Sequence, residues 1–167
     1  QGEGVSASAA SWALAMIGLF NIFGSLVFGR LGDSLSKKSL LSFIYALRTV
    51  VISLFLLIPL SDITAIAFGA AIGFLWLATV PLTSGIVAQV FGTRYLTTLW
   101  AIVFFSHQLG AFLGIWLGGR VYDSTGSYTT IWLASIALGI VAAVVHLPIR
   151  EQPWKPAIPE QLTASGK

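Results

Sequence analysis

The chain has 167 residues, of which 56% are hydrophobic and only 9% are charged. An ordinary soluble domain carries about 25% charged residues, so this composition excludes a soluble fold with a hydrated surface. The net charge of +3 does not indicate nucleic-acid binding, because the basic residues are spread over several short segments. Without cysteine, the chain has no disulfides, thiol catalysis or cysteine metal ligands, and we expect neither a metal nor a cofactor.

The uncharged stretches of the sequence are long enough to cross a membrane. Val5–Gly29, for example, contains no charged residue. A helix of about 20 residues spans the ~30 Å hydrocarbon core of a bilayer. Residues 1–149 are therefore predicted to form an all-α membrane fold with five transmembrane helices, at about 7–28, 39–60, 64–90, 96–119 and 129–148.

A short basic segment, Gly29–Lys38, joins the first two predicted helices. Asp33 is expected just past a helix end, where its carboxylate could accept backbone N–H groups of the next helix or pair with a basic residue. Lys37 and Lys38 would hold the segment at anionic lipid headgroups. The segment is therefore either a latch between two conformational states or only an anchor for the topology.

The second predicted helix contains Arg48, which lies about 15 Å from the membrane surface at a rise of about 1.5 Å per residue. Ionisable residues at membrane depth are functional candidates. No Asp or Glu lies inside a predicted span to neutralise this arginine. Arg48 therefore either binds an anion or takes part in ion coupling, or it donates hydrogen bonds to helix carbonyls.

The third predicted helix contains Pro81, which removes one helical hydrogen bond and favours a kink. Thr79 and Thr83 share one face around this kink, and Trp76 lies one turn away. We expect Trp76 to form the wall of a binding site and the two hydroxyls to donate hydrogen bonds to a bound solute. The alternative is a kinked packing helix whose hydroxyls bond to the backbone.

The fourth predicted helix carries His107 and Gln108 near its middle. A neutral histidine there either bonds to a neighbouring helix or titrates and couples a proton to the function. Gly110, Gly114 and Gly118 follow at helical spacing and form a stripe of small residues. Such a stripe is predicted to let another helix approach closely.

Further polar residues lie in other predicted helices. Asn21 shares a face with Ser25 and is a candidate substrate contact. His146, near the end of the fifth helix, is expected to meet water. Ser84 resembles the nucleophile of intramembrane serine proteases, with His107 as its base, but the first glycine of that motif is missing. We therefore predict no enzyme activity, and an intramembrane hydrolase is the weaker alternative.

The basic residues are distributed unevenly between the two sides of the membrane. On one predicted side, Arg120 is the only basic residue. The side with the excess is predicted to be cytoplasmic, which places the C-terminus inside the cell and the N-terminal end outside. Residues 150–167 contain several prolines and are predicted to form a disordered cytoplasmic tail. The basic residues on the cytoplasmic side are Arg30, Lys37, Lys38, Arg94, Arg150, Lys155 and Lys167.

Two segments resemble motifs of the major facilitator superfamily. The segment Gly119–Tyr128 is similar to the turn before the last helix of many members, most clearly in the monocarboxylate-transporter-like branch. The other resembles the signature Gly-x-Leu-Ala-Asp-Arg-x-Gly-Arg-Lys, with matches at Gly29, Leu31, Gly32, Asp33, Lys37 and Lys38. The resemblance implies a fragment of a twelve-helix fold, helices 8 to 12, with the N-terminal half missing.

The same resemblance implies a secondary active transporter that moves a small solute by alternating access. A carboxylate or another organic anion is the first candidate, with a proton or counter-ion as the coupled ion. We expect a multi-pass protein of a bacterial inner membrane, and its partners would be the bilayer, the solute and the missing half. Asn21 and Ser25 replace the Asp and Arg of animal-type monocarboxylate transporters, so their proton–lactate mechanism is not implied. A channel or non-transporting sensor is the alternative.

Overall fold

The computed structural model describes residues 4–153, and all regular structure in that range is helical. Five helical segments are long and apolar enough to cross a membrane, one of which consists of α3 and α4 together. The all-α membrane fold expected from the sequence is therefore confirmed. The elements are α1 (Ala7–Ser34), α2 (Lys37–Leu57), α3 (Asp62–Trp76), α4 (Thr79–Phe91), the 3-10 turn η1 (Thr93–Tyr95), α5 (Leu96–Thr125) and α6 (Thr129–His146).

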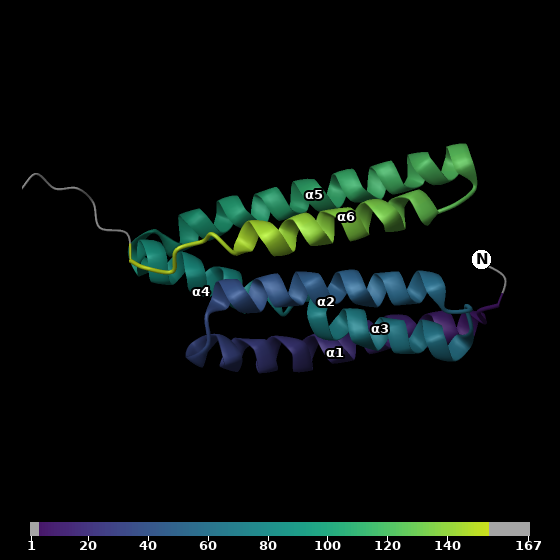
Figure 1. Ribbon diagram of the computed structural model, residues 1–167, viewed down its shortest axis with the longest axis horizontal. Coiled ribbons are helices and arrows are strands. Elements are labelled where there is room, and N and C mark those ends of the chain that lie inside the picture. Colours follow the sequence, from purple (N-terminus) through teal and green to yellow (C-terminus); the bar gives the residue numbers. More distant parts are fainter. Residues whose placement is uncertain (1–3, 154–167) are drawn as a thin grey trace, which may run out of the picture.

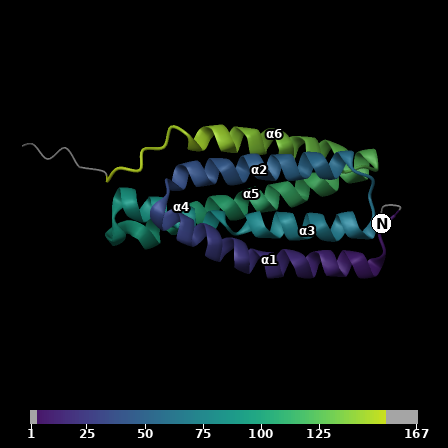
Figure 2. The same ribbon diagram turned by 60° about the horizontal axis from the view of Figure 1, so that its bottom comes forward.

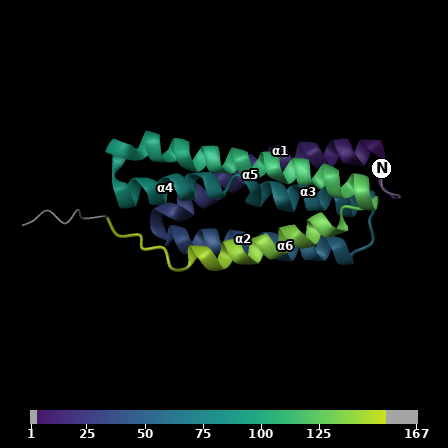
Figure 3. The ribbon, with the colours of Figure 1, turned by 90° about the horizontal axis from the view of Figure 1, so that it is seen from above.

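The helices run along one long axis, and their connections gather at two ends (Figure 1). One end carries the N-terminus, the α2–α3 connection and the α5–α6 turn. The other end carries the α1–α2 connection, η1 and residues 147–153. Figure 2 shows α1 beside α3, and Figure 3 shows α2 beside α6, in agreement with the contacts between these pairs.

The predicted basic side of the membrane corresponds to the second of these ends. Lys155 and Lys167 lie outside the described residues, as does the predicted disordered tail from residue 154 onward. The basic residues found in the segments at that end are Arg30, Lys37, Lys38, Arg94 and Arg150.

Glycines of α3 bring its backbone against that of α1. A Cβ atom added to Gly73 would lie 2.6 Å from both Cα and the carbonyl oxygen of Ile17, and one added to Gly69 would lie 2.6 Å from the carbonyl oxygen of Ala13. These distances are below van der Waals contact, so only glycine fits. The two glycines are four residues apart and therefore share one face of α3, which is the small-residue packing found between membrane helices.

The glycine stripe of α5 has no such neighbour. A Cβ added to Gly110, Gly114 or Gly118 would meet no atom of the described residues within 4 Å, apart from its own helix and chain neighbours. The helix partner predicted for this stripe is therefore absent from residues 4–153. That the stripe packs against another helix stays a prediction, and such a helix would not be one of the described helices.

The buried hydrophobic core lies where α1, α2, α3 and α4 meet. Ile44 of α2 and Leu82 of α4 are almost completely inaccessible, and so is Ala78, which separates α3 from α4. One side of the α3–α4 junction is thus packed into the core. The cluster consists of Phe28, Leu40, Leu41, Ile44, Leu75, Ala78 and Leu82.

Candidate functional site

The third membrane span is broken, which goes beyond the kink that its proline predicts. Helix α3 ends at Trp76 and α4 begins at Thr79, with Pro81 in the first turn of α4. Proline lacks the N–H group that would bond to the carbonyl of Leu77, and that carbonyl accepts a bond of 3.0 Å from Val80 N instead. The tighter turn leaves neighbouring backbone groups without helical partners.

Two side chains from other helices bond to these backbone groups. Arg48 of α2 donates through Nη2 to the carbonyl oxygens of Leu75 and Trp76, the latter at 2.6 Å. Asn21 of α1 accepts a hydrogen bond of 3.0 Å from the N–H of Leu77. Of the two roles expected for Arg48, bonding to helix carbonyls is the one for which the structure contains contacts.

A cavity of about 280 Å³ lies beside the break, between α4 and α5, and α2 and α6 also contribute to its lining. It brings together Trp76, Thr79, Thr83 and His107, which the sequence singles out from two different spans. None of the lining residues is acidic. The full lining is Tyr45, Trp76, Leu77, Thr79, Val80, Thr83, Trp100, Val103, Phe104, His107 and His146.

The polar groups of the cavity differ in whether a protein partner already binds them. Thr79 donates a long bond of 3.4 Å to the carbonyl of Trp76, so its hydroxyl is partly used. No hydrogen bond within residues 4–153 uses the hydroxyl of Thr83, although a threonine in a helix commonly bonds back to the preceding turn. His107 stacks on Phe104 with ring centroids 6.3 Å apart and makes no hydrogen bond among the described residues.

Several lining residues were missed by the sequence reasoning. His146 was expected to meet water, but it is half-buried, lies over the Tyr45 ring at 5.1 Å and has Nδ1 2.6 Å from the carbonyl oxygen of Ala142. Tyr45 is three residues before Arg48, and its ring lies 5.2 Å from the Arg48 guanidinium. The three-residue spacing from Arg48, which places both side chains on one helix face, was the only feature of the sequence that pointed to Tyr45.

Other candidates lie outside the cavity. Asn21 and Arg48 bond to the backbone of the break and do not line the cavity. The exposed Gln108 is also not among the lining residues. Gly110 and Gly114 line an open groove of about 490 Å³ that also includes Trp76 and His107. The groove therefore continues along α5 from the two residues that it shares with the cavity.

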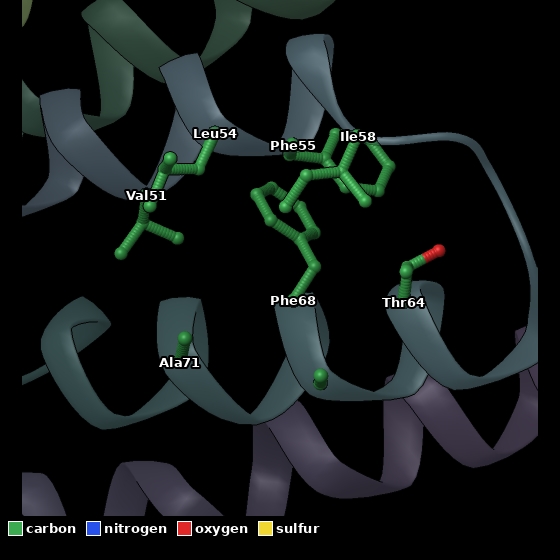
Figure 4. Close-up of a pocket in the computed structure, with 8 residues that line it drawn as sticks. Val51, Leu54, Phe55, Ile58, Thr64, Phe68 and Ala71 are labelled. Carbon is green, nitrogen blue, oxygen red and sulfur yellow. The ribbon is translucent and has the colours of Figure 1, made fainter.

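A second cavity, of about 230 Å³, lies between α2 and α3 and is almost entirely apolar (Figure 4). Thr64 supplies its one hydroxyl, which already bonds to the backbone and side chain of Ser61 and to the carbonyl of Pro59. The stacked rings of Phe55 and Phe68 fill the middle of the opening. This cavity has no free polar group to recognise a solute.

The α1–α2 segment differs from its predicted form. Only Leu35 and Ser36 are outside helices, and Asp33 is exposed within the last turn of α1. The expectation that Asp33 lies past the helix end is therefore wrong. No hydrogen bond within residues 4–153 involves its side chain. Gly29 also lies within α1, against Pro81 of α4.

Another acid, Glu151, bonds to the beginning of α2. Its Oε1 accepts hydrogen bonds from the N–H of Lys38 at 2.5 Å and from the hydroxyl of Ser36 at 3.3 Å. Lys38 Nζ in turn donates to the carbonyl of Leu147 at 3.1 Å, just after α6. The start of α2 is thus tied to the chain that follows α6.

Helix α4 joins the same network through Gln89. Its Oε1 accepts a bond of 3.0 Å from Lys37 Nζ, and its Nε2 donates a bond of 2.7 Å to the carbonyl of Glu151. We call Ser36, Lys37, Lys38, Gln89 and Glu151 the polar cluster. It joins α2, α4 and the segment after α6.

The arrangement required of a serine hydrolase is not found among residues 4–153. The Ser84 hydroxyl donates to the carbonyl of Pro81 at 3.1 Å, and no hydrogen bond joins Ser84 to His107. Ser84 is also not among the residues that line the cavity with His107.

Comparison with known proteins gives consistent matches. The family model described as Major Facilitator Superfamily matches residues 2–164. The uncharacterized MFS-type transporter YcxA of Bacillus subtilis is 31% identical over 140 residues, which cover 80% of this chain and 34% of the relative. Monocarboxylate transporter 12 of Mus musculus is 26% identical over 162 residues, covering 90% of this chain and 33% of that protein.

A third relative, monocarboxylate transporter 12-B of Danio rerio, is 29% identical over 139 residues, which cover 81% of this chain and 29% of its own length. The chain therefore spans about a third of the length of the curated relatives it matches. No solved structure gives a significant match.

Proposed function

The chain belongs to the Major Facilitator Superfamily, and from that premise we propose that it is part of a secondary active transporter that moves a small solute by alternating access. The cavity beside the broken third span carries the proposal, because it is lined by hydrogen-bonding side chains from several helices. Broken membrane helices and cavities between helices are the usual setting of solute sites in such proteins.

The lining favours a neutral or anionic solute over a cation. Its polar groups are hydroxyl, indole and imidazole groups, all able to donate hydrogen bonds, and no carboxylate accompanies them. The relatives named as monocarboxylate transporters support a carboxylate or another organic anion as the first class to test. His107 is the candidate proton-coupling residue, because it lines the cavity without a hydrogen-bond partner among residues 4–153.

A substitution at Thr83 tests the site. Thr83→Val keeps the shape of the side chain and removes its hydroxyl, which no described protein group uses. The loss of one hydrogen bond, worth about 0.5–1.5 kcal/mol, should raise the apparent KM for uptake about threefold to tenfold. Uptake by the full-length protein in proteoliposomes measures this, with carboxylates tried first.

Thr98→Val on α5 is the matched control, because Thr98 is exposed outside the cavity lining. Its KM should equal that of the wild type. An unchanged KM in Thr83→Val, for a solute that the wild type transports, would contradict the placement of the site.

The protein is a multi-pass integral membrane protein, and its orientation is part of the proposal. The excess of basic residues at the end that contains the α1–α2 connection favours a cytoplasmic location for that end. The bacterial inner membrane is proposed as its location because one relative is bacterial. We propose as partner of this chain a further set of membrane helices, of the kind that could make up the rest of the longer relatives.

Cysteine labelling tests the orientation. Ser34→Cys and Ser124→Cys place thiols at exposed positions near opposite ends of the bundle, in a chain that has no cysteine. A membrane-impermeant thiol reagent should label Ser124→Cys in intact cells and Ser34→Cys only after the cells are opened. Labelling of both variants in intact cells would rule out the proposed topology.

A further inference from the structure

The α3–α4 break leaves backbone groups that an intact helix would pair. In a continuous helix, the carbonyls of Leu75 and Trp76 would accept hydrogen bonds from the N–H groups four residues later in the chain. The N–H of Leu77 would donate a hydrogen bond to the carbonyl of Gly73. Helix α3 ends at Trp76, and no backbone hydrogen bond of these three groups is found where α3 meets α4. An unpaired backbone group inside a bilayer costs several kcal/mol, and such a break therefore needs polar partners.

The partners come from two helices. Arg48 of α2 bonds to both carbonyls, and Asn21 of α1 bonds to the Leu77 N–H. Arg48 thus supplies hydrogen-bond donors for the two carbonyls, and Asn21 supplies an acceptor for the N–H group. No other side chain of residues 4–153 bonds to these three backbone groups, except the long Thr79 contact to Trp76.

The same contacts explain how a charged arginine is accommodated without an acidic partner among residues 4–153. The C-terminal end of a helix carries partial negative charge, which favours a cation. Arg48 lies against this end of α3, and its guanidinium also lies 5.2 Å from the Tyr45 ring centroid, within cation–π range.

Some residues of the break also line the cavity, whereas the two side chains that bond to the break do not line the cavity. Trp76, Leu77 and Thr79 line the cavity, and Arg48 and Asn21 do not. We propose that Arg48 and Asn21 are positioning residues, which set the shape of the solute cavity by holding the α3–α4 break from α2 and α1. This inference rests on the proposed transport function for its kinetic consequence but not for its structural one.

The chemistry of the contact predicts which substitutions are tolerated. Both Arg48 bonds come from one nitrogen, so a lysine ammonium with three donors can replace them. Arg48→Met keeps length and removes all donors. Asn21→Leu keeps size and removes the acceptor, whereas Asn21→Asp retains an acceptor for the Leu77 N–H.

The experiment has a structural and a kinetic readout on the full-length protein. In a Leu77→Cys background, the rate of thiol labelling reports access at the break. Arg48→Met and Asn21→Leu should change this rate at least threefold, and Arg48→Lys and Asn21→Asp should restore it. In transport, Arg48→Met should raise KM about tenfold, with kcat reduced less, and Arg94→Met at the exposed end should change neither readout.

The outcomes separate the two proposals. A labelling change without any transport by the wild type would refute the proposed function and support the positioning role. Unchanged labelling in both Arg48→Met and Asn21→Leu would overturn the positioning role. If Arg48→Lys transports as poorly as Arg48→Met while labelling stays at the wild-type rate, Arg48 acts on the solute directly, and the inference is wrong.

Discussion

Replacing Gly73 by leucine should prevent the protein from accumulating in a folded form. Even a single Cβ at this position would lie 2.6 Å from the Ile17 backbone. Overpacking of a core by extra methylenes costs about 1–3 kcal/mol when side chains can adjust. Here the obstacle is backbone, so α1 and α3 would have to separate, and the cost should exceed that range. Detergent-extracted yield on size-exclusion chromatography measures the loss.

Two matched glycines make the prediction specific. Gly18→Leu adds the same side chain to α1 at a position where a Cβ meets nothing within 4 Å, and its yield should be close to wild type. Gly114→Leu tests whether the α5 stripe contacts a helix outside the described residues, in which case transport should fall. Normal yield for Gly73→Leu would show that α1 and α3 are not packed as described.

Removing the Glu151 side chain should slow transport more than it weakens solute binding. Its carboxylate accepts two hydrogen bonds at the start of α2. Bonds to a charged group contribute about 1.5–3 kcal/mol, and partial exposure reduces this toward about 1 kcal/mol. A change of that size shifts a two-state population about fivefold. Glu151→Ala should therefore lower the initial uptake rate about fivefold.

The proposal behind this prediction is that the polar cluster stabilises one of the two access states. Equilibrium binding in the same variant should change by less than the uptake rate, because no residue of the cluster lines the cavity. Asp33→Asn is the control. Asp33 makes no hydrogen bond within residues 4–153, so its substitution should have a smaller effect than Glu151→Ala. Equal rates for Glu151→Ala and the wild type would leave the α1–α2 segment as a topology anchor.

Composition and the length of uncharged stretches were sufficient to predict the all-α membrane fold, because lipid demands long apolar helices whatever the packing. The break in the third span was only partly predictable. Pro81 indicates a disturbed helix, but whether it bends or breaks depends on Arg48 and Asn21, which are distant in sequence. Tertiary hydrogen bonds of this kind leave no local pattern.

The candidate site was predicted in its central members and missed at its edges. Trp76, Thr79 and Thr83 were found because the proline marks their helix, and His107 because it is ionisable at membrane depth. In the polar cluster, Lys37 and Lys38 were singled out from the sequence, whereas Gln89 and Glu151 were not. Glu151 follows the last span and resembles any polar residue of a tail until α2 and the end of α6 are seen together.

The glycines show the same limit of local patterns. The stripe of Gly110, Gly114 and Gly118 is the more regular one, yet the close contact among the described residues involves Gly69 and Gly73. The spacing of glycines in the sequence shows that a helix has a face of small residues. Only the tertiary structure determines whether another helix packs against that face.

Solute uptake by the full-length protein, reconstituted in proteoliposomes, tests the transport function and the site most directly when it is screened with a panel of small carboxylates and neutral solutes. We predict saturable uptake of at least one carboxylate, with a KM that rises in Thr83→Val and stays at the wild-type value in Thr98→Val. Saturable uptake with the same KM in all three proteins would contradict the cavity beside the α3–α4 break as the site. No saturable uptake of any solute by the folded protein would contradict the transport function itself.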